Sequence, residues 1–253
     1  ASAGTSNFRA GVNAGNSITS GGNYNTVVGD EAGTAITTGD DNTSVGYKAG
    51  YALTTGTNNV LIGGNAGDAI TTGTDNVALG RASLTSDTLG QSSVAIGHQA
   101  LFSQNFTSAT HAYNVAVGKN AGLALSTGVY NTLIGGLAGD AITTGSNNAS
   151  LGHLSLSANT TGGSNVALGA YALYSNTTAS DNTAVGKNAL FVNTTGADNV
   201  AVGTSSLDAN TTGASNTGIG RSALGANTTG ASNTAVGHNA LDANTEGLYN
   251  SAL

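Results

Sequence analysis

The chain has 253 residues, of which 39 are Gly and only 8% are charged; its net charge is −7, and it lacks Pro, Cys, Met and Trp. The absence of Cys excludes disulfides, zinc fingers and thiol nucleophiles, and the acidic charge disfavours nucleic-acid backbones, which require clustered Lys and Arg. No apolar run approaches the ~18 residues of a membrane span, so we expect a structural protein with no nucleic-acid partner and no membrane insertion by this segment.

A repeat begins near the N-terminus and continues to the end of the chain. An aliphatic residue followed by Gly recurs fourteen times, and this Gly is taken as position 0 of each unit. The step from one such Gly to the next is 18 at first, 21 once and 17 everywhere else. The anchors are Gly11, Gly29, Gly46, Gly63, Gly80, Gly97, Gly118, Gly135, Gly152, Gly169, Gly186, Gly203, Gly220 and Gly237.

Each unit predicts one short strand over positions −3 to −1, from residues 26–28 in the second unit to 234–236 in the last. Position −1 is aliphatic and −3 is mostly Thr or Val, both typical of strands. We expect −1 and −3 to face the inside, and we expect the mostly small, apolar side chains at position −2 to face outward as an interaction surface. Asn at −4 and Gly at fixed offsets predict corners, because both residues tolerate left-handed backbone.

Each unit has one large apolar side chain at either position +4 or position +7, and never at both. Eight units have Leu at +4 and a polar residue at +7, as in Leu173 with Asn176. Six have Gly at +4 and an aliphatic at +7, which predicts that the two positions share one core pocket. Those six pairs are Gly15 with Ile18, Gly33 with Ile36, Gly50 with Leu53, Gly67 with Ile70, Gly122 with Leu125 and Gly139 with Ile142.

Units too small to bury a face alone must stack, so the sequence predicts an all-β parallel β-solenoid (β-roll) of about 14 coils with no long helix. We expect a single uncapped repeat domain over residues 1–253, because both ends match the interior of a repeat. The one irregular step places four extra residues within 102–113, a predicted surface loop. Aromatic residues on such a loop make it the first candidate receptor contact: Phe102, Phe106, His111 and Tyr113.

Two segments resemble known repeat families. Ser92-Ser93-Val94-Ala95-Ile96-Gly97 and the segment from Asn182 to Leu190 are similar to the head repeats of YadA-like trimeric autotransporter adhesins and, more closely, to repeats of phage tail fibres. The resemblance implies a homotrimeric left-handed β-roll for attachment, extracellular on a virion tail or bacterial surface. Its receptor would be a cell-surface glycan or protein, and it supplies no catalytic residues, metal or cofactor. The 17-residue period departs from the shorter adhesin repeat.

Charges are sorted by position in the repeat. Asp recurs at −5 and +5, and position +1 is the most variable corner. Its basic residues and histidines are Arg81, His98, Lys119, His153, Lys187, Arg221 and His238. They form either a ligand track for surface glycans or, as we favour here, solvated corners that pair with acidic residues between coils or chains.

Two alternatives to an attachment fibre remain open. Uncapped ends would suit end-to-end assembly into an extracellular filament, and paired Thr at +8 and +9 would suit an ice-binding solenoid, although adjacent strand residues face opposite ways. No arrangement of Ser, His and Asp indicates an enzyme.

Overall fold

The computed structural model describes residues 4–253. Residues 1–3 lie outside the described residues, and with them part of the expected 1–253 domain and of its expected start inside a repeat. The protein is an all-β parallel β-solenoid of about 14 turns with a repeat of ~17 residues, as the periodicity predicts. None of the described residues forms a helix, so no helix in that part of the chain could cross a membrane. Two compact units, one ending at Thr127 and one beginning at Gly128, are described in turn.

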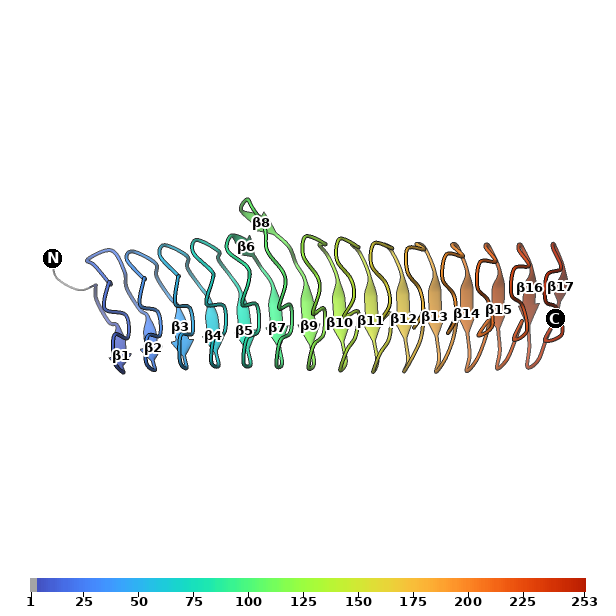
Figure 1. Cartoon of the computed structure of the whole chain (residues 1–253), viewed down its shortest axis with the longest axis horizontal. Coiled ribbons are helices and arrows are strands. Elements are labelled where there is room, and N and C mark those ends of the chain that lie inside the picture. The colour runs from blue at the N-terminus through green and yellow to red at the C-terminus, as the bar shows by residue number, and fades with distance from the viewer. Residues whose placement is uncertain (1–3) are drawn as a thin grey trace. The chain divides into compact units, whose positions relative to one another are not determined.

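In the first unit, seven short strands stack in parallel, one per coil (Figure 1). Residues one repeat apart are partners, for example Val77 with Val94 and Val94 with Val115. Two further two-residue strands, β6 (Gly90–Gln91) and β8 (Thr110–His111), pair at the opposite edge of the coils. The stacked strands are β1 (Phe8–Ala10), β2 (Thr26–Val28), β3 (Thr43–Val45), β4 (Val60–Ile62), β5 (Val77–Leu79), β7 (Val94–Ile96) and β9 (Val115–Val117).

The second unit repeats this arrangement with eight parallel strands in chain order. Thr183 pairs with Val200, and Val200 pairs in turn with Thr217. The strands are β10 (Thr132–Ile134), β11 (Ala149–Leu151), β12 (Val166–Leu168), β13 (Thr183–Val185), β14 (Val200–Val202), β15 (Thr217–Ile219), β16 (Thr234–Val236) and β17 (Ser251–Ala252).

The predicted orientation of the strands is wrong. Position −2 is buried in every strand from Val27 to Ala235, whereas positions −1 and −3 of the same strands are never buried. The coil is narrow, and the large side chain from +4 or +7 already fills it, as Leu173 and Ile142 do with no exposed surface. Small side chains at −2 complete this core, and the larger aliphatic side chains are turned outward.

The shared pocket of +4 and +7 is confirmed. A Cβ added to Gly33 would lie 2.7 Å from Ile36 Cδ1, and one added to Gly139 would lie 2.7 Å from Ile142 Cδ1. Position −2 enters the same pocket, since the Gly33 Cβ would also overlap Val27 Cγ1. Accordingly, −2 is Ala, Ser or Gly in all eight coils that have Leu at +4.

The Asn residues at −4 form a buried ladder instead of left-handed corners. The Asn42 backbone N–H and Nδ2 both donate to Asn25 Oδ1, at 3.0 and 3.1 Å, and Nδ2 also donates to the Gly56 carbonyl at 2.9 Å. The left-handed residues instead occupy positions 0, +2, +4 and −5. Buried polar groups need hydrogen-bond partners. Because one Asn side chain per coil provides such partners for three groups, the ladder fixes the register of the stacked coils.

Candidate functional site

The outer face of the strands carries a mostly apolar surface, because position −1 is Val, Ile or Leu from Val28 to Val236 and position −3 is mostly Val or Thr. It is formed by the −1 and −3 side chains, here called the outer sheet face, and it runs through the successive strands of each unit. In the second unit the exposed fractions of Leu151, Leu168 and Ile219 are 46%, 40% and 40%. An apolar hollow on this face is lined by Thr132, Ile134, Ala149, Ser150, Leu151, Val166, Ala167 and Leu168. Exposed apolar surface of this regularity marks an interaction site.

The segment 102–113 stands out from the coils at β8 (Figure 1) and is only partly the exposed aromatic loop that the sequence predicts. His111 and Tyr113 are exposed and stacked, with ring centroids 5.6 Å apart, and Phe102 is half-buried. Phe106 is 5% exposed, which corrects its expected role as a contact residue. Its backbone is held by Asp87 Oδ1 and by the Thr88 hydroxyl, so this ring anchors the loop.

A buried polar network supports the loop from below. Gln104 Nε2 donates to Asp87 Oδ2 at 2.6 Å and to Ser93 Oγ at 2.9 Å, while Gln104 Oε1 accepts from Asn114 Nδ2 at 2.9 Å. Ser93 is the one −4 residue that is not Asn, so Gln104 bridges the gap in the ladder. Burial raises the pKa of Asp87, against the opposing effect of the hydrogen bond from Gln104 and those from the backbone.

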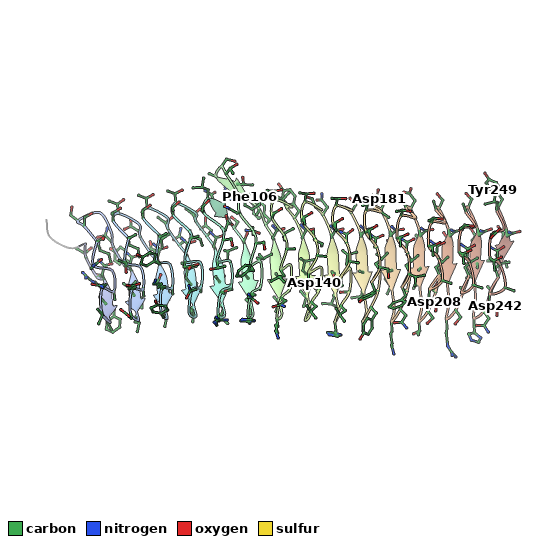
Figure 2. All side chains as sticks on the ribbon, viewed as in Figure 1. Phe106, Asp140, Asp181, Asp208, Asp242 and Tyr249 are labelled. Carbon is green, nitrogen blue, oxygen red and sulfur yellow. The ribbon has the colours of Figure 1, made fainter. Side chains whose placement is uncertain are left out.

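The +1 residues project from an exposed corner, as expected, but their expected ion pairs within the chain are not found. The one ion pair among residues 4–253 joins Lys48 and Glu31, both at position +2, at 3.3 Å. Arg81 Nη1 lies 3.2 Å from His98 Nε2 on the next coil. Figure 2 shows the acidic columns of the second unit on different edges, with Asp181 (−5) on one and Asp208 and Asp242 (+5) toward the other.

Two aromatic clusters on the corners were missed by the sequence reasoning. Tyr174 and Phe191, both at +5 in successive coils, stack with centroids 5.3 Å apart, and Tyr171 packs edge-on against both. Lys48 Nζ lies 5.3 and 5.1 Å from the rings of Tyr47 and Tyr51. Hydrogen bonds with Tyr47 and Glu31, and the Glu31 charge, raise the pKa of Lys48. Aligning positions +1, +2 and +5 across neighbouring coils would have shown both clusters.

The two Thr positions of each pair, +8 and +9, differ in burial, as the alternating direction of neighbouring side chains predicts. Thr at +8 is half-buried and its hydroxyl donates to the carbonyl one coil on, as Thr177 does to Thr194 at 3.1 Å. Thr at +9, such as Thr161 and Thr178, is exposed. The Asn-Thr-Thr segments read like glycosylation signals, yet their Asn side chains are fully buried and form a second ladder: Asn159, Asn176, Asn193, Asn210 and Asn227.

No protein-family model and no curated protein matches this sequence. The tail-fibre and adhesin resemblance therefore stays a prediction. Among residues 4–253, no three His, Asp or Glu side chains are grouped closely enough to hold a metal ion. The chemistry that the described surface offers is apolar contact along the sheet and charged or aromatic contact along the corners.

Proposed function

We propose that the protein is a structural attachment fibre, a homotrimeric β-solenoid displayed outside the cell on a virion tail or bacterial surface. The observation that carries the proposal is the outer sheet face, a mostly apolar surface with an aliphatic side chain at −1 in each coil from Val28 to Val236. The ladders of Asn and backbone hydrogen bonds give each unit a rigid repeat, as a shaft or head of such a fibre needs. The tail-fibre resemblance supplies the expected stoichiometry of three.

The exposed area on this face is large enough to drive association. Full burial of an aliphatic side chain contributes about 1.5–3 kcal/mol, so covering the exposed 40% of Leu168 or of Ile219 contributes about 0.6–1.2 kcal/mol. Association costs about 4–15 kcal/mol in lost freedom of motion. Four such side chains in the second unit, those of Leu151, Val166, Leu168 and Ile219, together contribute about 2.5–5 kcal/mol, which reaches the lower end of this cost.

Oligomeric mass tests the proposal. Sedimentation of the wild-type chain should give a mass of three 24.4 kDa chains. Replacing Leu151 and Leu168 by Lys should release monomers, because charged side chains on the apolar face must be desolvated in the assembly. The matched control puts Lys at Thr161 and Thr178, exposed +9 positions of the same two coils, and should remain trimeric. A wild-type monomer at micromolar concentration would refute the trimer.

The receptor contact within this fibre is proposed for the 102–113 loop, through Phe102, His111 and Tyr113. Deleting residues 107–110, four residues of the loop, restores the 17-residue step while keeping Phe106 and Gln104. Circular dichroism should show an intact β-solenoid, and binding to cells or glycans should be lost. Unchanged attachment would assign recognition to another part of the fibre.

The exposed +9 Thr column favours one second candidate, ice binding. Six successive coils of the second unit expose this Thr, a regular ladder of hydroxyl and methyl groups: Thr144, Thr161, Thr178, Thr195, Thr212 and Thr229. Thermal hysteresis of the wild-type protein, abolished by Thr161→Lys with Thr178→Lys, would establish this function in place of attachment.

A further inference from the structure

Three consecutive coils of the first unit present a basic side chain or a histidine at position +1. Arg81 and Lys119 are exposed and His98 is half-buried. The backbone holds them in register, because Gln99 N–H donates to the Arg81 carbonyl at 3.0 Å and Asn120 N–H donates to the His98 carbonyl at 2.9 Å. Adjacent stacked strands are ~4.8 Å apart, so the three side chains form a row parallel to the stacking direction.

No ion pair neutralises the row within residues 4–253. Neither Arg81 nor Lys119 forms an ion pair in the part of the chain that the structure describes. Asp68, at +5 on the preceding coil, accepts hydrogen bonds from Asn65 and Thr85 instead. Four of the six Lys and Arg residues of an acidic protein are placed at +1, and only this run occupies three successive coils with basic residues and His. A local positive row in a protein of net charge −7 is a specific feature of its surface.

We propose that Arg81, His98 and Lys119 bind an acidic polysaccharide lying along the stacked coils. The inference rests on the proposed attachment function and adds the chemical class of its receptor. Guanidinium and ammonium groups bind carboxylate and sulfate groups by charge-assisted hydrogen bonds. The same coils carry Phe102 and Leu123 at +5, both half-buried, which offer apolar surface on this corner for the C–H faces of sugar rings.

Charge density favours a polysaccharide over a nucleic acid. Duplex DNA carries one negative charge per ~1.7 Å, and its binding needs more clustered cations than this row provides. A polysaccharide with one acidic group per sugar or per disaccharide matches a row with one Arg, His or Lys side chain per coil. The surrounding net charge of −7 repels a dense polyanion more strongly than a sparse one.

Binding measurements on the full chain test the inference. The probes are heparin as a sulfated glycan, polygalacturonate as a carboxylated glycan, dextran as an uncharged glycan, and duplex DNA. We expect the wild type to bind at least one acidic glycan at low ionic strength, more weakly as salt rises, and not to bind dextran. Arg81→Gln with Lys119→Gln should weaken that binding at least ~10-fold, since both charge-assisted contacts are lost.

The matched control is Lys187→Gln with Arg221→Gln, which removes two cations from the same column where Thr204 stands between them. This variant should bind within about two-fold of the wild type, because the charge change is equal but the row is intact. Equal losses in both variants, equal binding of DNA, or no binding of either acidic glycan would each overturn the proposal. Sedimentation of the same samples separates the two proposals. A trimer that binds no glycan would refute only glycan binding by the row, and a monomer that binds glycan would refute only the trimeric fibre.

Discussion

Replacing Asp87 by Asn should stabilise the first unit at neutral pH. Asp87 is fully buried and occupies position +7, where the second unit has a ladder of Asn. In that ladder Asn176 Nδ2 donates to the carbonyl three positions on, that of Ala179, at 2.9 Å, and its Oδ1 accepts from the next coil. An amide side chain at position 87 would reproduce this pattern, with Gly90 as the acceptor and Gln104 as the donor, and without a buried charge.

The magnitude follows from the groups that change. The carboxylate loses hydration on burial and recovers part of it through Gln104 Nε2 at 2.6 Å and the Gly90 N–H at 2.9 Å. Removing the buried charge and keeping the Gln104 bond favour the variant, whereas the N–H groups of Gly90 and Phe106 lose their acceptor, so the unfolding free energy should rise by only about 1 kcal/mol at pH 7. A raised folded-state pKa means that the protonated form of Asp87 is the one that folding favours. The advantage of the Asp87→Asn variant is therefore full above the folded-state pKa and shrinks as the pH falls toward the unfolded-state value.

Urea denaturation followed by circular dichroism at pH 7 and near pH 4 measures both effects. Asp181→Asn, the same charge change at an exposed corner, is the control and should shift stability by less than about 0.5 kcal/mol. An Asp87→Asn variant that is less stable than the wild type at pH 7 would show that its hydrogen bonds outweigh the cost of burying the charge.

Three further predictions concern the second unit and are measured by thermal or urea unfolding. Gly139→Leu should destabilise the second unit, because its Cβ would lie 2.7 Å from Ile142 Cδ1, and adding Ile142→Ala should recover part of this loss; a double variant no more stable than the single one contradicts the shared pocket. Gly203→Ala should cost at least ~2 kcal/mol, because φ is +133° and the new Cβ would lie 2.5 Å from the Gly220 carbonyl oxygen; a neutral result contradicts the close approach of the coils. Asn193→Ala removes donors to Asn176 Oδ1 and the Gly196 carbonyl and should cost about 2–4 kcal/mol, whereas a change below about 1 kcal/mol would mean that water replaces the ladder.

The repeat, the coil and the shared pocket could be predicted from the sequence because each depends on spacing. A constant repeat length requires identical neighbours, and two positions that never hold large side chains together must compete for space. The inward and outward sides of the strand could not be assigned by the rule that larger aliphatic residues are buried. That rule fails here because the coil is too narrow for Leu168 as well as Leu173.

One sequence signal did contain the correct orientation. Large aliphatic side chains at position −2, those of Val27, Leu61 and Leu133, occur only in coils with Gly at +4, which places position −2 in the core. The buried Phe106 and the bridging Gln104 had no comparable signal, since the inserted residues interrupt the alignment that would compare them with other coils. Polar ladders were also hidden, because an Asn in a turn and an Asn in a ladder have the same spacing.

The Asn ladders have a consequence for how the chain can change over evolutionary time. Each Asn bonds the coil before it and the coil after it through the same atoms, so every interior coil offers its neighbours identical ends. Recombination that adds or removes one whole coil of the Leu173 type would leave each remaining amide with its partners. The protein can thus be lengthened or shortened by whole coils with its hydrogen bonds unchanged, whereas extra residues within one coil must be placed in a loop, as they are in the segment 102–113.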